Sequence, residues 1–186
     1  MYDLMIIGAG PGGIFAAVEA LSLQPDLKIA MFDAGGPLEK RKCPIDGKKI
    51  KSCIHCASCS IMNGFGGAGA FSDGKYNITN EFGGTLHEYI GADTAIDLME
   101  YVDAINCQYG GAETKLYKNN DQEIAKKCLQ SDLHLLKANV RHLGTDINYK
   151  VLTHLYDELK EKVDFYFYHH VDQVDPIEGG YEVKVK

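Results

Sequence analysis

Apolar positions near the start of the chain follow the order strand, turn, helix, strand. A short apolar run at residues 4–7 gives way to six small residues at 8–13, and an apolar helix pattern follows at 14–21. Pro25 ends that helix, because proline cannot continue one. A second apolar run covers residues 27–32. This order predicts a βαβ unit.

The middle of the chain predicts loop first and helices later. Residues 34–92 read mostly as loop. Residues 93–107 carry an apolar stripe with helical spacing, and a shorter helix is expected over 121–130. Residues 133–143 are ambiguous, although their alternation of apolar and polar positions favours a strand.

The last forty residues predict a return to the sheet. Asp146 is expected to cap a helix over 147–162 that has one apolar face. Residues 163–171 are rich in aromatic and β-branched side chains, which favour a strand. We expect this to be the third parallel strand of the sheet that the βαβ unit begins. A glycine pair then predicts a hairpin into residues 181–186.

Together these elements predict an α/β fold. We expect a Rossmann-like βαβ domain that carries a long loop and helical insertion. The expected parts are the βαβ unit at 1–36, the insertion at 37–145, and the returning sheet with the start of a β-meander at 146–186.

The glycine turn indicates dinucleotide binding. Gly8 allows a tight turn, Gly10 lets a pyrophosphate approach the backbone, and Gly13 lets the helix pack against the strand. The helix N-terminus then presents free N–H groups to the phosphates. Asp33, 25 residues after Gly8, can accept hydrogen bonds from ribose hydroxyls.

The same unit serves NAD and FAD enzymes. Two features favour FAD: the unit lies at the N-terminus, and a long insertion follows it where an NAD domain would continue with the next strand and helix. Two alternatives stay open, an NAD(P)-binding enzyme and a non-enzymatic module that binds a nucleotide or a metal.

The composition of the chain excludes some classes of binding partner. The net charge of −7 argues against nucleic acid, which normally needs a basic patch. No run of apolar residues reaches the length of a membrane span, and no targeting segment is visible. We therefore expect a cytoplasmic protein without nucleic-acid or membrane partners, acting on a small-molecule substrate and an electron acceptor that the sequence does not identify.

Four of the six cysteines gather in the predicted loop, at Cys43, Cys53, Cys56 and Cys59. Four thiolates could hold zinc or an iron–sulfur cluster. The other interpretation is a set of reduced thiols near the flavin. We predict that the four are not all metal ligands, and we assign no metal residues.

A glycine- and alanine-rich stretch at residues 64–75 suggests a packed loop whose backbone approaches a flat ligand. Together with residues 8–13, 53–59 and 141–146, it resembles the uncharacterised FAD-dependent dehydrogenases of bacteria, in the glutathione-reductase-type flavoprotein group. The resemblance covers essentially the whole chain, but members of that family are more than twice as long.

The resemblance implies a flavin-dependent oxidoreductase. The turn residues and Asp33 would hold the ADP half of FAD, Arg41 and Lys42 would face the pyrophosphate or ribityl chain, and the backbone of Val171 would meet adenine. The loop at Gly66, Gly67 and Ala68 would pass near the flavin ring. The predicted cofactor residues are Gly8, Ala9, Gly10, Pro11, Gly12, Gly13, Asp33, Arg41, Lys42, Gly66, Gly67, Ala68 and Val171.

No catalytic acid or base can be named from the sequence. The family's fold continues beyond the third strand through a meander to a final strand with another flavin contact. We therefore expect a truncated Rossmann-like FAD-binding domain that by itself holds little flavin and is inactive.

Overall fold

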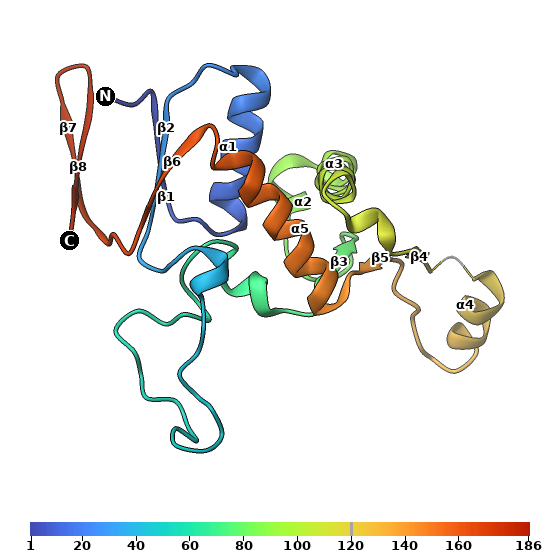
Figure 1. Ribbon diagram of the computed structural model, residues 1–186. Coiled ribbons are helices and arrows are strands. Elements are labelled where there is room, and N and C mark those ends of the chain that lie inside the picture. Colours follow the sequence, from blue (N-terminus) through green and yellow to red (C-terminus); the bar gives the residue numbers. More distant parts are fainter. Residues whose placement is uncertain (120) are drawn as a thin grey trace. The chain divides into compact units, whose positions relative to one another are not determined.

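The computed structural model describes residues 1–119 and 121–186. They form two compact units, unit 1 with Met1–Phe71 and Leu152–Lys186, and unit 2 with Ser72–Val151. Figure 1 follows the chain through both. Among the described residues, no helix combines the length and hydropathy that crossing a membrane would demand.

A three-stranded parallel sheet organises unit 1. Strands β1 (Leu4–Ile7) and β2 (Ile29–Asp33) are joined by helix α1 (Pro11–Leu23), and β6 (Val163–Phe167) pairs with the other side of β2. Figure 1 shows the three strands beside α1. The predicted βαβ unit and its late third strand are confirmed, and the fold is α/β.

The third strand is shorter than predicted. It stops at Phe167 because Tyr168 has a positive φ of 60°, which an extended strand excludes. A separate antiparallel hairpin follows, formed by β7 (Val171–Ile177) and β8 (Gly180–Val185). The predicted glycine turn is confirmed, with Gly179 at φ 82°.

Aromatic and aliphatic side chains fill the core of unit 1. Phe65 is fully buried, and its ring makes edge contacts with Tyr156 and Phe165. Tyr156 lies on helix α5 (Gly144–Leu159). The α5 side chains Leu152, Leu155 and Leu159 of unit 1 are buried, as is Val151, the last residue of unit 2, which confirms the predicted apolar face.

The predicted start of that helix is wrong. Asp146 was expected as the N-cap, but α5 begins two residues earlier, at Gly144, so Asp146 lies in its first turn. An acidic residue there is still favourable, because it faces the positive end of the helix dipole.

Unit 2 combines helices with a small antiparallel sheet of order β3-β5-β4. The predicted helix at 93–107 is confirmed, as is the helix at 121–130, where Asp121 accepts a hydrogen bond from the N–H of Ile124 at 3.0 Å. Its elements are β3 (Lys75–Ile78), α2 (Leu86–Ile90), α3 (Ala92–Gln108), β4 (Leu116–Lys118), α4 (Gln122–Leu129) and β5 (Asn139–His142).

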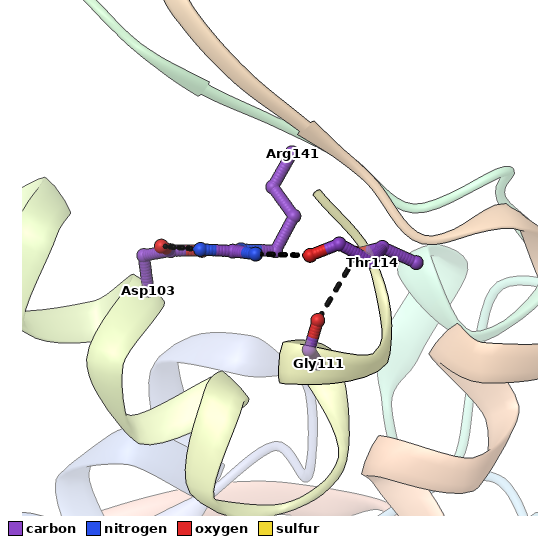
Figure 2. A network of polar contacts seen from close by, with 4 residues as sticks. All are labelled: Asp103, Gly111, Thr114 and Arg141. Carbon is purple, nitrogen blue, oxygen red and sulfur yellow. Dashed lines mark hydrogen bonds and ion pairs between the residues drawn. The ribbon is translucent and has the colours of Figure 1, made fainter. Parts of the chain in front are cut away.

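A buried ion pair holds this unit together (Figure 2). The guanidinium of Arg141 donates two hydrogen bonds to the carboxylate of Asp103, at 2.7 and 2.8 Å. It also donates to the carbonyl oxygen of Thr114, at 2.5 Å. The pairing raises the pKa of Arg141. These contacts tie β5 to α3 and to the segment that leads into β4.

Candidate functional site

The glycine turn after β1 has the geometry its sequence predicts. Gly8 has φ 101° and donates its N–H to the carbonyl of Phe32 at 2.7 Å. A Cβ at Gly13 would lie 1.9 Å from the Gly8 carbonyl oxygen, so no larger residue fits. Glycine is therefore required at both positions, for the turn and for the helix packing.

The first turn of α1 is open to a ligand. Gly10 is the N-cap residue, and Pro11 and Gly12 are exposed. A Cβ at Gly10 would come no nearer to the protein than 3.9 Å, at the Cα of Gly67. The first N–H groups of a helix lack internal partners and carry partial positive charge. This space and these donors suit a phosphate.

A pocket of about 220 Å³ lies beside the turn, where the three parallel strands end. Ligands of open α/β sheets bind at this carboxyl edge. The pocket is smaller than the ~300–1,000 Å³ of a typical small-molecule site, so it suits one part of a dinucleotide. Its lining residues are Ile7, Gly8, Phe32, Asp33, Ala34, Asn63, His169, His170 and Val171.

Asp33 lies on the wall of this pocket. Its Oδ1 accepts hydrogen bonds from the N–H groups of Gly35 and Gly64, each at 2.7 Å, and its Oδ2 accepts one from Ala9 at 2.8 Å. A carboxylate has about four acceptor positions. Asp33 thus joins the turn to the glycine-rich loop and retains capacity on Oδ2. Its contact with a ribose stays a prediction.

The glycine-rich loop packs directly against the turn. The N–H of Gly66 donates to the carbonyl of Ala9 at 2.8 Å, and a Cβ at Gly67 would lie 3.3 Å from the Cα of Gly10. Ala68 is exposed. The structure therefore brings together two motifs that lie more than fifty residues apart in the sequence. Contact of this loop with a flavin ring stays a prediction.

Arg41 is occupied by the protein itself. Its side chain is buried and donates to the carbonyl oxygens of Ser60 at 3.0 Å, Ile61 at 2.8 Å and Phe65 at 2.6 Å. Its guanidinium also lies 4.8 Å from the ring centre of Phe71. Burial lowers the pKa of Arg41.

These contacts make Arg41 the clamp of the segment that leads into the glycine-rich loop. Its neighbour Lys42 is exposed. Contact of either residue with a pyrophosphate or ribityl chain stays a prediction.

The two histidines on the pocket wall were missed by the sequence analysis. The N–H of His169 donates to the carbonyl of Asp33 at 3.0 Å, and its Nδ1 lies 2.7 Å from the carbonyl of Phe167. The prediction counted residues 168–170 as strand. The positive φ of Tyr168 instead turns them across the end of the sheet. Val171, predicted to meet adenine, lines the same pocket.

The four loop cysteines line a second pocket of unit 1, about 260 Å³ in volume. All are free thiols; Cys53 and Cys56 are exposed, while Cys43 and Cys59 are half-buried. Among the described residues, no three His, Cys, Asp or Glu side chains are placed to hold a metal ion as they stand.

No family model and no curated protein matches the chain. Among solved structures, glycine oxidase from Geobacillus kaustophilus is similar at 14% identity with a TM-score of 0.52; the match covers 99% of this chain and 51% of that one. The chain thus spans about half the length of that oxidase. This similarity supports the fold.

Two further structures are similar with lower scores. THI4 from Thermovibrio ammonificans has 11% identity and a TM-score of 0.41, covering 98% of this chain and 45% of that one. L-Amino acid deaminase from Proteus myxofaciens has 13% identity and a TM-score of 0.41, covering 100% and 42%.

Proposed function

We propose that this chain is the FAD-binding part of a flavin-dependent oxidoreductase of the dehydrogenase type. One observation carries the proposal. The carboxyl ends of three parallel strands form a pocket containing Gly8, Asp33 and Val171, next to an exposed helix N-terminus.

The residues present fit the cofactor in order along its length. Adenosine would occupy the pocket, where the Oδ2 of Asp33 has capacity for a ribose hydroxyl and the backbone near Val171 would meet the edge of adenine. The pyrophosphate would lie over Gly10 and the N–H groups of α1, where a side chain would otherwise stand. These assignments rest on the geometry of unit 1.

The glycine-rich loop supports FAD over a smaller nucleotide. Gly66 and Gly67 pack on the turn, so Ala68 and its neighbours lie next to the phosphate position. A ligand that extends beyond its pyrophosphate would meet this backbone. FAD would supply the redox chemistry, and the protein would supply position and electrostatics.

The similarity to a solved oxidase agrees with an oxidation–reduction role. The dehydrogenase type follows from the family resemblance. The substrate and the electron acceptor are not identified by the residues described. The chain itself offers backbone donors and one carboxylate at the cofactor position.

Gly10→Ala tests the proposal without disturbing the fold. The backbone of Gly10 has φ −77°, which alanine adopts freely, and the new Cβ meets no protein atom closer than 3.9 Å. We expect FAD affinity, measured by isothermal titration, to fall at least about tenfold because the methyl group stands in the pyrophosphate's path.

Gly180→Ala is the matched control. That glycine lies at the start of β8 with open space around its Cβ. Its replacement should leave FAD affinity unchanged. Equal affinities in the wild type and both variants would reject the pyrophosphate site, and tighter binding of NAD⁺ than of FAD would favour a nicotinamide enzyme.

A further inference from the structure

Four cysteines from two separate stretches of sequence meet at one place in unit 1. Cys43 lies in one stretch, and Cys53, Cys56 and Cys59 lie in another, yet all four line the same pocket of about 260 Å³. The remaining two cysteines, Cys107 and Cys128, lie on helices of unit 2.

The spacing of these four residues matches one type of ligand set. Three cysteines stand at two-residue intervals, and the fourth, Cys43, is followed by Pro44. In bacterial ferredoxins a cubane cluster is bound by three cysteines with this spacing and by a remote cysteine that precedes proline. A structural zinc site instead uses two separate pairs of ligands.

The placement of the four cysteines around one pocket also suits a cluster. A tetrahedral zinc ion needs its sulfurs about 2.3 Å from one centre. In a cubane each thiolate binds a different iron, so the four sulfurs surround the cluster. The four cysteines line one pocket of about 260 Å³, and no three of the described His, Cys, Asp or Glu side chains are placed to hold a single metal ion as they stand.

The surroundings suit such a cluster. Three apolar residues, Pro44, Ile45 and Ile54, share the pocket wall with the cysteines. The chain is acidic overall, but between residues 40 and 60 it holds six basic side chains and a single acidic one. Nearby cations favour thiolates, and they offset the negative charge of a cluster with four thiolate ligands.

The segment is anchored at one end and open at the other. The carbonyl of Cys59 accepts hydrogen bonds from the N–H groups of Met62 and Asn63, at 3.0 and 2.8 Å, and Ser58 donates to the carbonyl of Ala34 at 2.9 Å. Cys53 and Cys56 are exposed. Iron and sulfide can therefore reach the exposed pair from solution.

We propose that Cys43, Cys53, Cys56 and Cys59 together bind a [4Fe–4S] cluster. This replaces the expectation, drawn from sequence alone, that the four are not all ligands. The proposal is independent of flavin binding, because none of the four cysteines lines the pocket at the strand ends.

Anaerobic reconstitution tests it. The chain is incubated with ferrous iron and sulfide, desalted, and analysed for iron, acid-labile sulfide and zinc, with an electron paramagnetic resonance spectrum after dithionite reduction. We expect about four iron and about four sulfide per chain and a signal of a reduced cubane.

Cys56→Ala should lose this iron, sulfide and signal, whereas Cys128→Ala, which removes a cysteine outside the pocket, should retain them. Cys56 is exposed, so its replacement leaves no core cavity; far-ultraviolet circular dichroism checks the fold. One equivalent of zinc held by Cys56, failure to take up iron and sulfide, or uptake that Cys56→Ala does not reduce would each overturn the proposal.

Discussion

Replacing Arg41 by methionine should destabilise unit 1 strongly. The side chain is 6% exposed and donates hydrogen bonds to three carbonyl groups, those of Ser60, Ile61 and Phe65. Methionine preserves much of the apolar stem but offers no donor. The Arg41→Met protein would therefore leave three carbonyl oxygens without this partner.

The magnitude follows from how buried each carbonyl bond is. The bond to Phe65 is buried, so its loss should cost the full penalty of an unsatisfied group, about 1–3 kcal/mol. The bonds to Ser60 and Ile61 are part-buried, and water can replace the lost donor there. Adding roughly 0.5–1 kcal/mol for each gives a total of about 2–5 kcal/mol.

Urea denaturation followed by circular dichroism measures this, since the chain has no tryptophan. Lys42→Met is the control: Lys42 is exposed, and its replacement should change the free energy of unfolding by less than about 0.5 kcal/mol. A loss below about 1 kcal/mol for Arg41→Met would refute the clamp. Weakened FAD binding with unchanged stability would instead assign Arg41 to the cofactor.

Three further outcomes follow from the structure. Gly13→Ala should cost several kcal/mol in urea denaturation, because its Cβ would lie 1.9 Å from a carbonyl oxygen, while Gly12→Ala, with open space, should cost nothing. Arg141→Met should destabilise unit 2 by about 3–5 kcal/mol in the same assay, because it leaves the buried carboxylate of Asp103 without its partner. A change under about 1 kcal/mol would contradict this. Backbone N–H groups that donate to Asp46 lower the pKa of its carboxyl group. The turn that Asp46 forms should therefore be stable above the ordinary carboxyl pKa and should open as the pH falls through the lowered value. Amide exchange rates in this turn that do not change on acidification would disprove this.

The βαβ unit could be predicted because local signals agree there. The apolar run, the glycine turn, the helix pattern and the closing acid at Asp33 each indicate the same element order, and β1, α1 and β2 follow it. Gly8 and Gly13 were assigned correct backbone tasks, because those tasks depend only on the turn itself.

The insertion was harder to predict, because its strands depend on distant partners. β3 pairs with β5, which lies more than sixty residues later, and no local sequence pattern indicates this pairing. β5 occupies only the last part of the ambiguous stretch at 133–143. The short helix α2 has no buried residue, so its sequence carries no apolar stripe that would predict a helix.

Within the site, the sequence named the turn and Asp33 but missed how they are joined. The three hydrogen bonds of Asp33 link residues that are 2 to 31 positions away, which only the folded chain brings together. His169 and His170 were missed because the backbone turn at Tyr168 carries no sequence signal: tyrosine rarely adopts a positive φ.

The most direct test of the central claim is a nuclear magnetic resonance titration of the ¹⁵N-labelled chain with FAD, and separately with NAD⁺. It reports the site even where binding is weak. We predict that FAD shifts the amide signals of Gly10, Gly12 and Val171, together with those of Gly67 and its loop, and that FAD saturates at lower concentration than NAD⁺. Unchanged signals at the turn, or shifts confined to other parts of the chain, would contradict the account.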